Sequence, residues 1–137
     1  MMAISPRFHD AQLVGIALDC KRATLTVVQV NGKKWQIAIE DVQALHLNDF
    51  REGNIISDFA AFSGEDVPGG ILEILFAPPH PAAAERYHAE HARLLDAKRA
   101  LVQAGDAVLV VITPSYGAEF AALGAKLEVF PITSDDS

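Results

Sequence analysis

The residues best suited to chemistry gather in one stretch that contains Glu85, His88, Glu90 and His91. Glu85 and His88 have the Glu-x-x-His spacing of di-iron helix bundles. Those sites need a second copy of the motif and further glutamates from other helices, and this chain has one copy. His88 and His91 lie one helical turn apart, so the two imidazoles could share a metal ion with a third ligand. The sequence therefore predicts one candidate metal pair, completed by an acid from residues 49–66.

The same stretch predicts a long amphipathic helix over residues 81–104. Its apolar residues form two seams about 90° apart: Tyr87, Leu94 and Leu101 on one, and Ala84, Leu95 and Val102 on the other. His91 and Lys98 fall between the seams, and a buried imidazole or ammonium needs a partner. One interpretation is a polar pocket, or a subunit contact, beneath the helix. A pocket for a small apolar ligand between helix and sheet would be lined by Tyr87, His91, Leu94 and Lys98. The other interpretation is a partly covered face, with Lys98 extended to solvent and His91 hydrogen-bonded to the sheet.

Five residues outside the helix are further candidates. Asp10 could orient the imidazole of His9, although such a pair near a terminus more often fastens the first strand to its neighbour. Asp58 and Tyr116 are polar residues that would matter if the fold brought them to the histidines. Cys20 could be a nucleophile beside His9 or His46, but an unpaired cysteine usually fills space.

Two motif-like segments do not meet the requirements of the sites that they resemble. Residues 113–117 read Thr-Pro-Ser-Tyr-Gly, so a threonine replaces the first glycine of a Gly-x-Ser-x-Gly nucleophile elbow. Residues 68–70 read Pro-Gly-Gly, but the segment after them is expected to be a strand and not the helix of a phosphate loop. The sequence thus indicates no cofactor, and it favours a protein that is not an enzyme.

The negative charge is concentrated in the middle of the chain. Eight acidic residues and one basic residue, Arg51, lie between Glu40 and Glu73, and this stretch accounts for the net charge of −7. Its acids could bind Ca²⁺ or Mg²⁺, but their spacing matches no EF-hand. The alternative is a solvated acidic surface. A chain without a basic footprint is unsuited to nucleic acid or an anionic membrane, which leaves a protein partner or self-association.

Length and composition predict one globular domain. The chain has 137 residues, half of them apolar, which suits a single domain over residues 1–132 with a polar tail at 133–137. The single cysteine excludes an internal disulfide and favours a reducing cytoplasm. The first ten residues lack the apolar core of a signal peptide. The longest apolar run, residues 107–112, is too short to span a bilayer.

Hydrophobic periodicity predicts an α+β fold with a mainly antiparallel sheet. Strands are expected at 11–19, 24–30 and 34–40, and Asn31-Gly32 favours a type I′ turn in a β-meander. Further strands are expected at 43–48, 71–77, 107–113 and 125–132, and residues 55–62 are expected to form a strand or an irregular segment. Residues 118–124 are expected to form one helical turn. Gly105 is expected to end the long helix.

The opening residues 8–13, Phe-His-Asp-Ala-Gln-Leu, precede the meander and an acidic stretch that ends in Gly-Asn-Ile-Ile at 53–56. This arrangement resembles small uncharacterised bacterial domains that begin with Phe-His-Asp-(Ala/Ser)-x-Leu, some of which resemble immunity proteins of bacterial toxin systems. The resemblance covers roughly the first sixty residues. It implies a bacterial, cytoplasmic protein without assigned chemistry, and it transfers no catalytic residue.

These observations together favour a non-catalytic binding domain that forms a homo-oligomer, because half of the residues are apolar and a self-contact could cover surplus apolar surface. Two alternatives stay open. One is a small metal-binding protein or enzyme that uses His88, His91 and a nearby acid. The other is a binder of a small apolar ligand between helix and sheet.

Overall fold

The computed structural model describes residues 7–133, which form eight strands and two helices. In chain order the elements are β1 (Gln12–Asp19), β2 (Arg22–Val28), β3 (Lys34–Glu40), β4 (Ala44–Asn48), β5 (Asn54–Phe62), α1 (Ile71–Leu75), α2 (Glu85–Gln103), β6 (Val108–Tyr116), β7 (Glu119–Gly124) and β8 (Lys126–Ile132). The prediction of a mainly antiparallel sheet with one long helix is confirmed at this level. Neither helix combines the length and apolar character that crossing a membrane requires.

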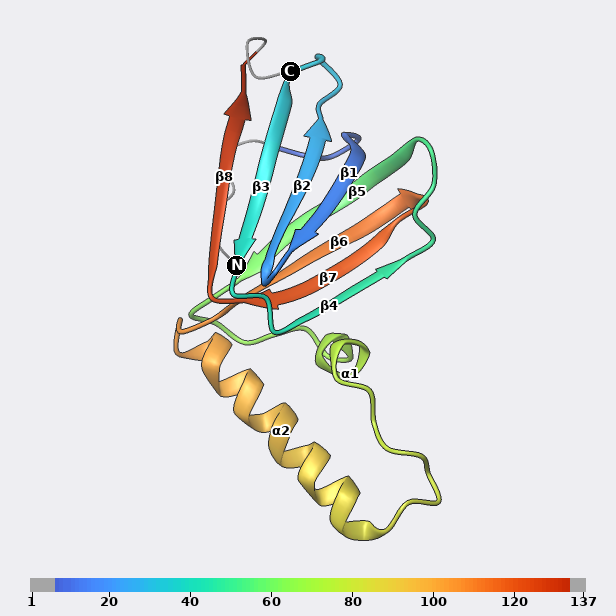
Figure 1. Ribbon diagram of the computed structural model, residues 1–137, viewed down its shortest axis with the longest axis vertical. Coiled ribbons are helices and arrows are strands. Elements are labelled where there is room, and N and C mark those ends of the chain that lie inside the picture. The colour runs from blue at the N-terminus through green and yellow to red at the C-terminus, as the bar shows by residue number, and fades with distance from the viewer. Residues whose placement is uncertain (1–6, 134–137) are drawn as a thin grey trace.

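All strand pairs are antiparallel and follow the order β4-β7-β6-β5-β1-β2-β3-β8. The sheet folds into two layers because the chain bends sharply between β3 and β4 and between β7 and β8. One layer contains β1, β2, β3 and β8, and the other contains β5, β6, β7 and β4 (Figure 1). The two bends lie side by side, since the N–H of Ala125 donates to the carbonyl of Glu40 at 2.8 Å.

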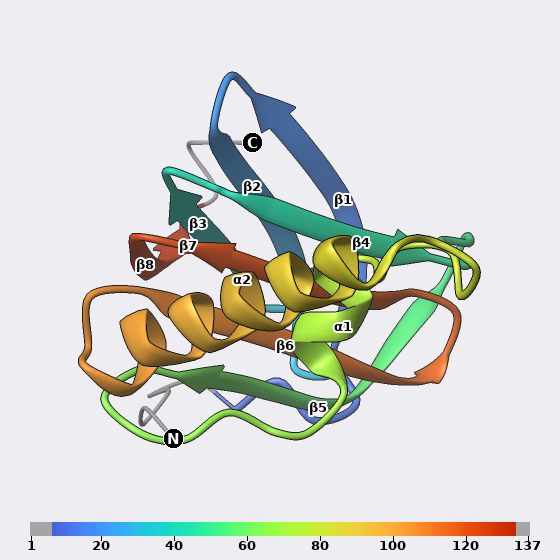
Figure 2. The same ribbon diagram turned by 90° about the horizontal axis from the view of Figure 1, so that it is seen from below.

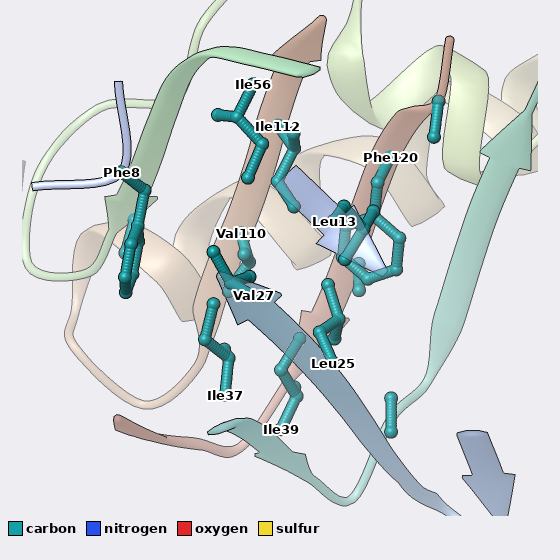
Figure 3. Packing of buried hydrophobic residues seen from close by; sticks show 14 of the residues in the cluster. Phe8, Leu13, Leu25, Val27, Ile37, Ile39, Ile56, Val110, Ile112 and Phe120 are labelled. Carbon is teal, nitrogen blue, oxygen red and sulfur yellow. The ribbon is translucent and has the colours of Figure 1, made fainter. Parts of the chain in front are cut away.

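The main core lies between the two layers. Alternate residues of each strand point into it, such as Leu25 and Val27 of β2 and Phe120 of β7, and all three are fully buried. Figure 3 shows these side chains meeting Ile37, Ile39, Val110 and Ile112 from the other strands. The period-two pattern that predicts strands therefore marks the core-facing residues too.

The β-meander is confirmed, but its type I′ turn is wrong. Asn31 does not have positive φ, whereas Gly32 has φ 87°. The N–H of Gly32 donates to the carbonyl of Gln29, and the N–H of Gln29 donates to the carbonyl of Lys33. The connection is therefore a three-residue loop, in which a turn is followed by a left-handed glycine. The Asn31 side chain accepts from the N–H of Lys33 at 2.9 Å, which stabilises this alternative.

The helices cover the outer face of the second layer (Figure 2). Val102 of α2 packs with Leu109 of β6 and Leu123 of β7 in a second apolar cluster, which Ile71 and Leu75 of α1 join. Only Leu95 and Val102 of α2 are buried. One predicted seam is thus buried through these two residues, while Tyr87 and Leu94 of the other seam are exposed.

Two local predictions are wrong. Residues 71–77 were expected to form a strand, but Ile71–Leu75 form a short helix. An apolar run of this length does not distinguish a strand from a buried helical turn, and Gly70, with φ 88°, turns the chain so that Leu72 is buried. Residues 118–124 were expected to form a helical turn, but Glu119–Gly124 form β7, which pairs with strands on both sides. Pairing on both sides outweighs the helical preference of its alanines.

The bounds of the long helix also differ from the prediction. The helix begins at Glu85 and not at residue 81, because His80 closes a turn before it. The carbonyl of His80 accepts from the N–H of Ala83, and its Nδ1 accepts from the N–H of Ala82. The helix ends as predicted, with Gly105 at φ 82°. Residues 134–137 of the expected tail lie outside the described residues.

Candidate functional site

The two layers do not cover each other completely on the side where β1 and β4 lie. Leu18 of β1 is paired with Ala23, and Leu47 of β4 is paired with Phe120. Directly paired residues share a face of the sheet, and Ala23 and Phe120 belong to the core. Leu18 and Leu47 therefore point into the space between the layers, yet 59% and 39% of their surfaces are exposed. The core is open to solvent at this place.

Two more exposed apolar side chains come from β1 and from the residues after β4, and both line one cleft. Val14, at an irregularity of β1, is 50% exposed, and Phe50, two residues after β4, is 44% exposed. We call these four residues, Val14, Leu18, Leu47 and Phe50, the open flank. Exposed apolar side chains at the rim of the core differ from scattered surface residues, because a partner that fills the opening can cover them.

The outer edge of β1 has no partner among the described strands along most of its length. β5 pairs with β1 only at Gln12 and Leu13. From Val14 to Asp19, β1 is therefore paired on one side only, with β2. In Figure 2 the turn of the β1–β2 hairpin projects beyond β4, and no described strand pairs with β1 along this edge. Such an edge presents unpaired backbone N–H and C=O groups to solvent.

A cleft of about 600 Å³ lies where the free edge of β1 ends. The residues that line it are Gln12, Leu13 and Val14 of β1 and Phe50, Arg51, Glu52 and Gly53 of the connection between β4 and β5. It forms because β5 pairs with β1 for two residues only, so the chain before β5 diverges from β1. The cleft is thus continuous with both the free edge and the open flank.

Asn54 fixes the wall of this cleft. Its side-chain oxygen accepts from the N–H of Arg51 at 2.7 Å and from the N–H of Ala118 at 2.9 Å. Its side-chain nitrogen donates to the carbonyls of Leu13 and Arg51. Asn54 is the buried polar residue of the described chain, and four hydrogen bonds satisfy its amide. In the sequence Asn54 stands out only as part of the Gly-Asn-Ile-Ile segment at 53–56, which gives no sign of this role.

The charges at the cleft are partly neutralised. The guanidinium of Arg51 hydrogen-bonds the carboxylate of Asp49 at 2.7 Å. This bond, together with the charge of Asp49 and an interaction with Tyr116, raises the pKa of Arg51 above its ordinary value. Arg51 therefore remains a cation that Asp49 holds in place, while Glu52 contributes an exposed carboxylate to the cleft. Tyr116, a predicted candidate, lies beside this ion pair at the end of β6.

The residues predicted to line a ligand pocket on α2 make structural contacts or are exposed. The Nε2 atom of His91 lies 2.8 Å from the carbonyl oxygen of Phe76, which ties α2 to the end of α1. The ammonium of Lys98 donates to the side chain of Gln43 at 2.6 Å and lies over the ring of Phe76. Tyr87 and Leu94 are exposed on the same helix. The interpretation of α2 as a partly covered helix therefore agrees with these contacts better than the ligand pocket does. His91, however, is bonded to the end of α1 and not to the sheet.

The remaining candidates are distributed over the molecule. The Nδ1 atom of the exposed His9 lies 3.1 Å from the carboxylate of Asp10, and the N–H of Asp10 donates to the carbonyl of Ile56. Asp58 is exposed on β5, and Cys20 is exposed in the turn between β1 and β2. His88 is half-buried one turn before His91. Within residues 7–133, no three His, Cys, Asp or Glu side chains gather so that they could hold a metal ion.

A smaller groove of about 220 Å³ lies between α1 and the outer face of the second layer. Ile71 and Ile74 of α1 and Val111 and Ala121 of the sheet provide its apolar lining, and Glu119 lies at the groove too. The imidazole of His46 is 3.6 Å from the carboxylate of Glu119. The structure therefore contains a groove between a helix and the sheet, but next to α1 and not next to the predicted α2 residues.

Comparison of the chain with protein-family models, with curated proteins and with solved structures gives no match.

Proposed function

We propose that this protein is a non-catalytic interaction domain that self-associates through the open flank. The observation that carries the proposal is the exposure of Leu18 and Leu47, two side chains that point into the space between the layers. When a partner excludes water from such apolar side chains, the free energy of the complex falls. The decrease is on the order of 1.5–3 kcal/mol for each large side chain that becomes fully buried.

A comparison of the free strand edges supports this location. The outer edge of β8 carries Lys126, Glu128 and Pro131, and charges and proline are the usual protection against strand pairing. β4, at the other end of the sheet order, has only five residues. The free part of β1, residues 14–19, reads Val-Gly-Ile-Ala-Leu-Asp, so it has no proline and its one charge lies next to the turn. Among the described edges, β1 is the one whose sequence favours a strand partner.

The contacts of the polar candidates support a non-catalytic function. His91 and Lys98 use their polar atoms to fasten α2 to α1 and to Gln43. The amide of Asn54 is occupied by backbone groups. These side chains contribute to the position of the elements, and their partners belong to the same chain.

Sedimentation velocity over a wide range of concentrations tests the proposal. We expect the unmodified protein to form a dimer or a larger homo-oligomer, and Leu47→Ser to shift it towards the monomer. Leu94→Ser is the matched control, because Leu94 on α2 is also 39% exposed but lies outside the open flank. A strict monomer at millimolar concentration would overturn the proposal. Equal effects of the two substitutions would move the contact away from the open flank.

The groove beside α1 favours a second function, the binding of a small ligand with an apolar body. Its lining is mainly apolar, and the carboxylate of Glu119 would suit a basic group on the ligand. Hexylamine is a suitable probe, with hexanoate as its acidic counterpart. We expect hexylamine to shift the methyl NMR signals of Ile74 and Val111 more strongly than hexanoate does. Unchanged signals with both compounds would contradict this function.

A further inference from the structure

We infer that the free edge of β1 pairs with the same edge of a second copy, antiparallel, about a two-fold axis at Ala17. The inference rests on the proposed self-association and deepens it by naming the partner strand and its register. A second copy fits because a two-fold axis presents each copy with the same elements: a free edge, an exposed apolar face and a cleft.

The β1–β2 hairpin determines which backbone groups are free. Asp19 and Arg22 are paired across the two-residue turn Cys20–Lys21, so they form a hydrogen-bonded pair. Hydrogen-bonded and non-hydrogen-bonded pairs alternate along an antiparallel ladder. Ala17 therefore directs its N–H and C=O towards β2. Ile16 and Leu18 direct theirs away from β2, towards the free edge.

Only one symmetric register pairs all of these free groups. If Ala17 lies opposite the Ala17 of the second copy, Ile16 of each copy faces Leu18 of the other. Both are hydrogen-bonded pairs, and two pairs with two bonds each give four backbone hydrogen bonds. A register centred on Ile16 would leave Leu18 opposite the irregularity at Val14. A register centred on Leu18 would place Ile16 opposite the turn at Cys20.

The side chains are compatible with this register. Ile16 and Leu18 point to the interior face, so each copy adds two apolar side chains beside the open flank of the other. On the opposite face Asp19 meets Gly15 of the second copy, so like charges do not face each other across the axis. The added strand would lie over Leu47, where the first layer leaves the second uncovered.

The cleft at the end of the free edge accommodates the turn of the second hairpin. In this register Cys20 and Lys21 of one copy lie opposite Val14 and Leu13 of the other, where the cleft of about 600 Å³ begins. β5 occupies the edge at Leu13, and the incoming strand turns back at the same point. The ammonium of Lys21 would enter a cleft that contains the carboxylate of Glu52, so the charges are complementary.

Disulfide trapping tests the register directly. In the proposed dimer the two Ala17 residues form a non-hydrogen-bonded pair, whose Cα atoms are about 4.5 Å apart, and this separation suits a disulfide. The background is Cys20→Gly, which removes the native thiol and suits the positive φ of 56° at this position. We expect Ala17→Cys to give a covalent dimer under mild oxidation. Thr24→Cys, which is paired with Ala17 but lies on β2, is expected to remain uncrosslinked.

Two proline variants distinguish a loss of the dimer contact from a loss of the fold. Leu18→Pro removes an N–H that points outward, so it is expected to keep the circular-dichroism spectrum and to weaken the dimer more than tenfold. Ala17→Pro removes an N–H that bonds to β2, so it is expected to lower the thermal midpoint of unfolding. If Leu18→Pro unfolds the chain, Leu18→Lys replaces it, since the lysine keeps the backbone donor and places a charge in the contact.

A charge exchange tests the position of the turn. Lys21→Glu and Glu52→Lys are each expected to weaken the dimer, and the double variant is expected to restore it. A dimer that is seen by sedimentation but is neither trapped by Ala17→Cys nor weakened by Leu18→Pro or Leu18→Lys would overturn the β1 contact and leave the proposed self-association intact. A monomer at all concentrations would instead overturn the proposed function itself.

Discussion

Leu18 of β1 and Leu47 of β4 face the space between the two layers from opposite sides, and both are exposed. Their strand neighbours Ala23 and Phe120 point the same way and are fully buried. The difference arises because the sheet order begins with β4 and places β1 beside β5 for two residues only. The position in the layers, and not the residue type, thus decides which core-facing leucines are covered.

Leu18→Ala and Leu25→Ala should therefore differ strongly in stability, although both leucines are core-facing strand residues. We expect Leu25→Ala to lower the free energy of unfolding by about 2–5 kcal/mol, because its side chain is fully buried and leaves a cavity. Leu18→Ala should cost less than about 1 kcal/mol. Urea unfolding at a protein concentration that keeps the chain monomeric measures both. Similar losses would mean that Leu18 is covered within one copy.

Asn54→Ala should destabilise the fold by about 2–4 kcal/mol, because it leaves the N–H groups of Arg51 and of the buried Ala118 without their acceptor. The environment is closely fitted to this amide, since a Cβ on Gly117 would lie 2.3 Å from the Asn54 oxygen. Asn48→Ala, at the exposed end of β4, is the control and should change stability by less than about 0.5 kcal/mol. Urea unfolding measures the difference, and equal small effects would contradict the structural role of Asn54.

Gly124→Ala should destabilise the bend between β7 and β8 by about 1–3 kcal/mol. A Cβ at this position would lie 2.7 Å from the carbonyl oxygen of Glu40 and 2.6 Å from a methyl group of Ile39. The backbone of Glu40 cannot easily move, because its carbonyl accepts from Ala125 in the neighbouring bend. Gly69→Ala serves as the control, since a Cβ there meets no atom within 4 Å. A thermal melt in which the two variants coincide would contradict this packing.

The ion pair at the edge of β8 should be visible in a pH titration. The ammonium of Lys126 lies 2.8 Å from the carboxylate of Glu128, and the hydrogen bond and charge of Lys126 lower the pKa of Glu128 below its ordinary value. Because the folded-state pKa is depressed, the stabilisation is complete above the unfolded-state pKa and is lost as the pH falls through the folded-state pKa. The carboxyl NMR signal of Glu128 measures this pKa directly.

Lys126→Ala should return the pKa of Glu128 towards its ordinary value, and added salt should do the same because the pair is exposed. Lys33→Ala, outside this ion pair, should leave that pKa unchanged. If the pKa of Glu128 is the same with and without Lys126, the ion pair does not form in solution.

The sequence contained enough information for the elements whose pattern is local. The strands at Lys34–Glu40 and Lys126–Ile132 and the end of α2 at Gly105 follow from period-two alternation and from a glycine at a left-handed position. Residues 71–75 and 119–124 did not follow, because short runs of apolar residues or alanine are compatible with either structure. Their packing on neighbouring elements decided between helix and strand.

The candidate site required the tertiary structure for the same reason. The sequence determined a chain with one acidic stretch, an antiparallel meander and a helix with two apolar seams, since these depend on residue type and spacing. Only the packing of α2 decided that Leu94 is exposed while Leu95 is buried, and only the strand order decided that Leu18 faces an uncovered part of the core. Burial depends on what lies opposite a side chain, and for β1 the residues opposite come from β4, far along the chain.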